Sequence, residues 1–261
     1  MTDGELLDMW GRWQAASDRS PGTIYLQRRY LERLAARHEL GDVTGDQVAA
    51  WLGGNGWAKS TKRSARAAVR SFFGWAHAHG LRQDDPTVLL GSVPLPPPCP
   101  RPTADVVFVR ACQQADGPEL LMLLLAASCG LRRAEIAGLH TDMIAGGKIR
   151  VTGKGGKTRA VPVTNQDLAR MLGELPEGWV FPGRFEGRPV TPDYVGRRLS
   201  RLLGPGWSGH TLRHRYASVV FAGSRNVLAL QKLLGHASPA TTQRYVEVDE
   251  ASLWEAAQWA A

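Results

Sequence analysis

Apolar residues recur every three to four positions through the first 90 residues, the spacing that places them on one side of an α-helix. The pattern predicts four helices, over about residues 4–16, 21–39, 46–53 and 59–79. Five of the nine tryptophans fall in this stretch, where we expect them to fill a core. The first 90 residues are therefore predicted to form a small helical domain.

Proline interrupts the helical pattern between residues 92 and 102, which read SVPLPPPCPRP. Proline at this density cannot continue a helix and favours an extended, semi-rigid chain. We therefore expect a linker over residues 91–104, between the helical domain at 1–90 and a second domain at 105–261.

Helical spacing returns in the second domain. Helices are predicted over about 105–115, 118–129 and 131–139, and further helices begin near Asn165 and Thr191. Between them, residues 148–163 read KIRVTGKGGKTRAVPV and alternate as a β-hairpin with a glycine-rich turn. The predicted fold is thus mainly α with a small β-hairpin or sheet, in the α+β class.

Charge points to a polyanionic partner, since the formal net charge is +8 and the isoelectric point is about 9.8. The helix predicted at 59–79 carries cations within an arc of roughly 100° and apolar residues on most of the opposite side. No acid interrupts this basic face, whereas faces that are merely solvated usually mix signs. We expect it to contact DNA through Lys59, Lys62, Arg63, Arg66 and Arg70.

Several other classes of protein fit the sequence poorly. The acidic start, MTDGELLDMW, is unlike a signal peptide, and the apolar run at 120–129 is too short to span a membrane. Three cysteines without paired spacing fit a reducing cytoplasm. The GGKT at 155–158 is not a P-loop, because Val151 stands where that motif needs glycine. No His/Cys/Asp cluster has metal-ligand spacing, so we expect neither metal nor cofactor.

The stretch from Ser208 to Glu247 carries the residues best suited to phosphodiester chemistry. His210 and Arg213 are three positions apart and would share one face of a helix. His236 follows a Leu-Leu-Gly that ends the next predicted helix, and Tyr245 lies on a short helix opened by Ser-Pro. Cationic donors and a phenol would then meet around one site.

Two earlier segments add to this set. CGLRRAEI at 129–136 places Arg132 at a helix start, with Glu135 one turn away to hold its guanidinium. TGKGGKTRAVPV at 152–163 carries Lys154 at the hairpin turn, where the residues alone favour a solvated lysine. Together with HTLRH, LGH and TTQRY, these segments resemble the boxes of the tyrosine recombinases, the phage integrase family, and occur in that family's order.

The resemblance, which covers the chain from about residue 105 onward, implies metal-free transesterification of DNA. The family's nucleophile matches Tyr245, whose phenol would form a covalent 3′-phosphotyrosine. The other matching catalytic positions, with Glu135 in support of the first, are Arg132, Lys154, His210, Arg213 and His236. The arginines and His236 would bind phosphate oxygens, and His210 would accept or orient the phenol proton. Lys154 would protonate the leaving 5′-oxygen, with Lys157 as the alternative.

The function implied is site-specific recombination through a Holliday junction, in the integration and excision of phage or mobile DNA, without metal or ATP. In the family, the N-terminal helical domain binds the core site, and this chain resembles the short form that lacks an arm-binding domain. A type IB topoisomerase and a non-catalytic DNA-binding regulator remain alternatives. Arg197, Arg198 and Arg201 either track a phosphate backbone or keep the surface soluble.

The expected partner is double-stranded DNA with inverted half-sites, in the cytoplasm of a bacterial host and associated with its nucleoid. Residues 250–261, EASLWEAAQWAA, read as a final helix bearing Trp254 and Trp259. The resemblance implies that this helix docks on a neighbouring protomer and so supports a tetramer on DNA. Docking within the same chain is the alternative.

Overall fold

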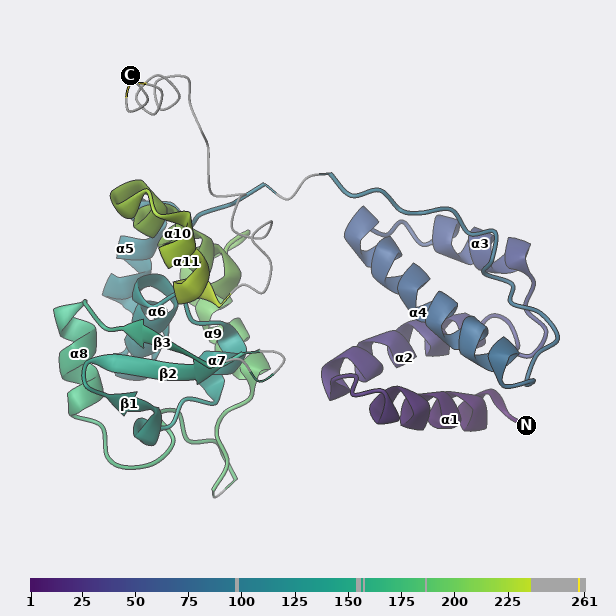
Figure 1. Ribbon diagram of the computed structural model, residues 1–261, viewed down its shortest axis with the longest axis horizontal. Coiled ribbons are helices and arrows are strands. Elements are labelled where there is room, and N and C mark those ends of the chain that lie inside the picture. The colour runs from purple at the N-terminus through teal and green to yellow at the C-terminus, as the bar shows by residue number, and fades with distance from the viewer. Residues whose placement is uncertain (97–98, 154–155, 157, 186, 236–257, 259–261) are drawn as a thin grey trace. The chain divides into compact units, whose positions relative to one another are not determined.

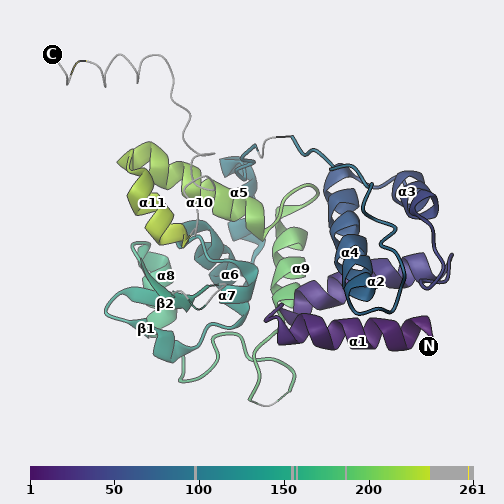
Figure 2. The same ribbon diagram turned by 45° about the vertical axis from the view of Figure 1, so that its right-hand side comes forward.

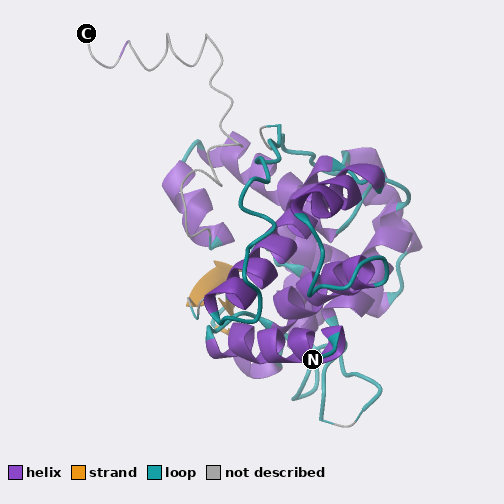
Figure 3. Ribbon diagram, turned by 90° about the vertical axis from the view of Figure 1, so that its right-hand side faces the viewer, coloured by secondary structure: helices purple, strands orange, loops and turns teal. Residues whose placement is uncertain are grey.

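The chain divides into two compact units, Met1–Pro97 and Pro98–Ala261 (Figure 1). The computed structural model describes residues 1–96, 99–153, 156, 158–185, 187–235 and 258. Helices dominate both units, and one small sheet lies in the second (Figure 3). The mainly helical α+β class predicted from the sequence is confirmed.

Four helices form the first unit: α1 (Asp3–Ala16), α2 (Pro21–Ala35), α3 (Gly45–Gly54) and α4 (Lys59–Ala78). Local sequence explains where the first three of them begin. The Thr2 and Thr44 hydroxyls each accept a hydrogen bond from the backbone N–H three residues on. The side chains of Glu5 and Gln47 in turn accept from the backbone N–H of Thr2 and Thr44, which completes a capping box at each helix. Proline at the first position of α2 needs no backbone donor there.

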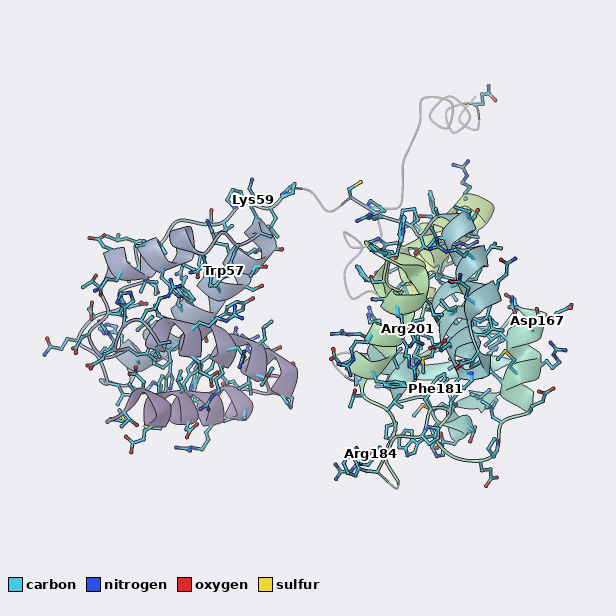
Figure 4. The ribbon with its side chains drawn as sticks, turned by 180° about the vertical axis from the view of Figure 1, so that it is seen from behind. Trp57, Lys59, Asp167, Phe181, Arg184 and Arg201 are labelled. Atoms are coloured by element: carbon cyan, nitrogen blue, oxygen red, sulfur yellow. The ribbon has the colours of Figure 1, made fainter. Side chains whose placement is uncertain are left out.

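Tryptophan fills the core of this unit, as predicted for most of its five indoles. Trp10, Trp51 and Trp75 are buried, and Trp10 meets Phe72 edge to face at 6.2 Å between ring centroids. Trp57 is half-buried and precedes Lys59 at the start of α4 (Figure 4). Trp13 departs from the prediction, because 39% of it is exposed and its ring lies against His79 at the surface.

The second unit contains α5 (Asp105–Gln114), α6 (Gly117–Ser128), α7 (Arg133–Ala137), α8 (Gln166–Gly173), α9 (Pro192–Leu203), α10 (Gly209–Ser224) and α11 (Val227–Leu234). Helix α6 is buried along most of its length, as its unbroken run of apolar residues predicts. It packs against α8, α9 and α10 (Figure 2). Helix α7 is shorter than the predicted 131–139, because Arg132 has extended backbone and serves as its N-cap.

The sheet has three antiparallel strands in the order β1 (Ile144–Ala145), β2 (Lys148–Thr152) and β3 (Thr158–Pro162). The last two form the predicted hairpin, with Thr152 opposite Thr158. The short β1 was absent from the sequence-based prediction, since two residues carry no periodic signal. Ile149, Val151 and Val161 point into the core from one face of the sheet, and α11 packs against β3.

Within the described part of the chain, no helix is both long and apolar enough to cross a membrane.

Candidate active site

Helix α10 supplies two of the predicted site residues. His210 lies in its first turn and is exposed, whereas Arg213, one turn later, is only 4% exposed. The Arg213 guanidinium donates through Nη1 to the Gly130 carbonyl and through Nη2 to the Leu234 carbonyl at 2.5 Å. These bonds join α10 to the end of α11 and to the residues just before Arg132.

Glycine at position 130 is required by this arrangement. Its φ of +61° lies in the left-handed region, and a Cβ there would come within 2.5 Å of the Tyr216 ring. Tyr216 is buried on α10, and burial raises the pKa of its phenol to about 12. Tyr216 therefore has the packing role expected from its position within the helix.

Arg132 and Glu135 form the pair predicted from their spacing. The Arg132 backbone N–H donates to Glu135 Oε2 at 2.8 Å, and its Nη1 donates to Oε1 at 2.9 Å. The Arg132 side chain stays 41% exposed, while that of Glu135 is 6% exposed. Glu135 therefore anchors the guanidinium from the protein side and leaves its outer edge open.

Arg159 on β3, which was not among the residues predicted from the sequence, is the second partner of Glu135. Its Nη1 and Nη2 donate to the two carboxylate oxygens of Glu135 at 2.8 and 2.9 Å, and its Nε donates to the Leu233 carbonyl at 2.7 Å. The side chain is 8% exposed. The sequence did carry one signal for a buried Arg159. Side chains alternate between the two faces of a strand, so Arg159 lies on the same face as Val161.

Glu135 is kept ionised by these contacts. Burial acts to raise its pKa, but the hydrogen bonds from Arg159 and from the Arg132 backbone, together with the two guanidinium charges, lower it to about 2. Arg213 Nη1 also lies 4.0 Å from Glu135 Oε2. One buried carboxylate thus holds three arginines, and the cluster retains a surplus of positive charge.

A pocket of about 570 Å³ opens beside this cluster in the second unit. Its lining residues are Arg132, Arg133, Asp193, Gly196, Arg197, Ser200, Ser208, Gly209, His210 and Arg213. Guanidinium groups, an imidazole and hydroxyls at one opening are the donors that bind phosphate oxygens. The pocket can therefore accept a phosphodiester and stabilise negative charge that develops on it.

The arginines of α9 divide between two roles. Arg197 lines the pocket and pairs with Asp193 at 2.7 Å. Arg198 and Arg201 instead donate to Glu119, a buried carboxylate on α6. Figure 4 shows Arg201 on α9, within the second unit. Arg198 and Arg201 thus tie α9 to α6, a contact within the protein that neither sequence-based alternative included.

The structure brings Arg132, His210 and Arg213 to one pocket, and the buried Glu135 binds Arg132 from the protein side. The predictions for Lys154, Lys157, His236, Tyr245 and the two C-terminal tryptophans fall outside the described residues. The five cations of the predicted DNA face lie on α4 in the first unit. Lys59, Arg63 and Arg70 are exposed there, whereas Arg66 donates to the Leu90 carbonyl at 2.6 Å.

Comparison with known proteins identifies the family. The Phage integrase family matches residues 106–252. Tyrosine recombinase XerC of Rhodospirillum centenum is 34% identical, over 94% of this chain and 83% of its own length. The chain belongs to the tyrosine recombinase family. Its activity is site-specific DNA recombination, which confirms the function inferred from the motifs.

Two further comparisons agree with this assignment. Tyrosine recombinase XerD of Caulobacter vibrioides is 31% identical, over 85% of this chain and 82% of its own length. The crystal structure of a lambda integrase tetramer bound to a Holliday junction superposes with a TM-score of 0.75 at 19% identity, covering 97% of this chain and 81% of that one. The recombinase thus shares the fold of lambda integrase.

Proposed function

We propose that this recombinase cleaves DNA by attack of Tyr245 on a phosphodiester bound in the pocket lined by Arg132, His210 and Arg213. One observation carries the proposal: segments far apart in sequence bring these three donors to a single opening. Glu135, which Arg159 holds in place, pairs with Arg132 and lies 4.0 Å from Arg213. Donors fixed in advance stabilise a phosphorane-like transition state without reorganising during the reaction.

The chemistry is a balanced exchange of esters. The Tyr245 phenol oxygen forms a bond to phosphorus, the bond from phosphorus to the 5′-oxygen breaks, and a 3′-phosphotyrosine and a free 5′-hydroxyl result. His210 accepts the phenol proton, and Lys154, or alternatively Lys157, donates one to the 5′-oxygen. His236 adds a hydrogen bond to the phosphate oxygens.

The same groups run the reaction in reverse. When the 5′-hydroxyl of another strand attacks the phosphotyrosine, the ester to DNA re-forms and the tyrosine leaves, so no nucleotide is consumed. Two such exchanges between paired duplexes pass through a Holliday junction. We propose integration and excision of mobile DNA in a bacterial cytoplasm, near the nucleoid, as the use of this reaction, in line with the name of the matching family.

The proposed substrate is duplex DNA with inverted half-sites, and each of the two units would contact it. Lys59, Arg63 and Arg70 on α4 would contact the phosphates from the first unit. The proposed assembly is a tetramer on paired sites, like the lambda integrase tetramer that was crystallised on a Holliday junction. Trp254 and Trp259 would support it by docking the final helix on a neighbouring protomer.

The test is trapping of the covalent intermediate. In a suicide duplex, a nick lies next to the cleavage site. After cleavage, the short fragment that carries the free 5′-hydroxyl diffuses away, so religation stops. Phosphotyrosyl adducts then accumulate and appear as a shifted band on a denaturing gel. Tyr245→Phe should bind this DNA like the wild type and form no adduct. Tyr216→Phe is the matched control, because it removes a phenol that packs against Gly130, and it should keep forming adducts. Adducts in the Tyr245→Phe variant would reject the assignment.

A further inference from the structure

The HTLRH segment contains a second histidine that the proposed chemistry does not use. His214 lies one turn after His210 on α10 and is 6% exposed. The two ring centroids are 4.3 Å apart, with the ring planes inclined by 59°. The His214 ring thus packs directly beside the histidine that lines the pocket.

A hydrogen bond from the start of the second unit fixes the orientation of His214. The Arg101 backbone N–H donates to His214 Nδ1 at 3.0 Å, although the two residues are 113 positions apart. A backbone N–H can only donate, so Nδ1 must present its lone pair, and a neutral ring carries its hydrogen on Nε2. The contact therefore sets both the tautomer and the direction of the ring.

The same short segment makes further contacts with α10 and with the loop just before it. The Thr103 backbone N–H donates to the Thr211 carbonyl at 3.1 Å, and the two buried hydroxyls are 2.7 Å apart. The Arg101 guanidinium lies over the Trp207 ring, 5.0 Å from its centroid. We call these contacts of residues 101–103 the 101–103 clamp.

We propose that His214 is a positioning residue, which the 101–103 clamp holds against His210 so that His210 keeps its catalytic orientation. The inference rests on the proposed function, because His210 is the group through which His214 acts. A ring packed at this distance restricts the rotamers open to its neighbour, and the bond from Arg101 restricts the ring itself. The end of the proline-rich segment would then contact α10, the helix that carries His210.

The backbone bond can be removed while both rings stay in place. Arg101→Pro lacks the N–H donor, and prolines already flank this position on both sides. Arg101→Ala is the matched control, since both variants lose the guanidinium and only Arg101→Pro loses the N–H donor. Single-turnover cleavage of the suicide duplex should be about ten-fold slower in Arg101→Pro than in Arg101→Ala. Equal rates in the two variants would overturn the proposal.

A second pair of variants acts on His214 itself. His214→Leu removes the acceptor and the ring, and should slow cleavage by about 10²-fold, as for a catalytic group displaced by about 1 Å. His214→Asn places an amide oxygen near the position of Nδ1, so it should recover part of the lost rate. The same rate for Leu and Asn would show that the acceptor plays no part.

The decisive readout is the dependence on His210. In a His210→Ala background, His214→Leu and Arg101→Pro should cause no further loss of the residual cleavage, because the group they position is gone. An equal loss in both backgrounds would mean a purely structural role and would overturn the inference. Failure of the wild-type protein to form any adduct would instead refute the proposed function. Half-site affinity and melting temperature, measured in parallel, should stay close to the wild-type values.

Discussion

Replacing Arg159 by methionine should destabilise the second unit strongly and impair cleavage. Methionine has a similar length and keeps the apolar stem, but removes two hydrogen bonds to Glu135 and one to the Leu233 carbonyl. Both partners of the ion pair are more than nine-tenths buried. Breaking such a pair from one side typically costs about 3–5 kcal/mol, because the remaining charge stays buried without its partner.

The pKa of Glu135 supports the size of this effect. Its value of about 2, against an ordinary 4.5, corresponds to about 3 kcal/mol of stabilisation of the ionised carboxylate at neutral pH. Arg159 supplies the largest share of the lowering. Without it, Glu135 should keep only the bonds from Arg132, and the pKa of its carboxyl should rise.

Urea unfolding and hydrogen exchange together measure the loss and its location. Amides of β3 and α11 should lose protection in Arg159→Met, while those of α4 in the first unit should keep it. Arg150→Met on the neighbouring strand is the matched control, since Arg150 is exposed, and it should change the free energy of unfolding by less than about 0.5 kcal/mol. A cost below about 1 kcal/mol for Arg159→Met, with adduct formation intact, would refute the view that Arg159 joins Glu135 to the end of α11.

Two further substitutions test the same cluster. Because the folded-state pKa of Glu135 lies below its ordinary value, its stabilisation should be complete above about pH 5 and disappear as the pH falls toward 2. Glu135→Gln should therefore unfold more easily at pH 7 and show a flatter loss of stability between those limits in urea titrations; an unchanged pH profile would contradict the assigned pKa. Gly130→Ala should cost about 2–4 kcal/mol, from a left-handed φ and a clash with Tyr216, whereas Gly146→Ala, with a similar φ and open space, should cost about 1 kcal/mol in the same assay. Equal losses of stability in Gly130→Ala and Gly146→Ala would show that the clash with Tyr216 contributes nothing.

Local sequence determined where most helices begin and which residues they bury. The first backbone N–H groups of a helix lack partners within the helix. Thr44 accepts a hydrogen bond from one of them, and Pro21 has no N–H to pair, so these helix starts need no distant partner. The pair of Arg132 and Glu135 was predictable for the same reason, because three positions separate them at a helix start. The order of the motifs identified the family before any geometry was known.

Tertiary structure decided which buried charges meet. Arg159 reaches Glu135 across 24 positions, and Arg213 reaches the Gly130 carbonyl across 83. The sequence does not distinguish an arginine that is exposed to water from one that is paired with a buried carboxylate. Only the packing of α7, β3, α10 and α11 removes water from these groups, and a buried charge must then find its partner in whichever segment packs beside it.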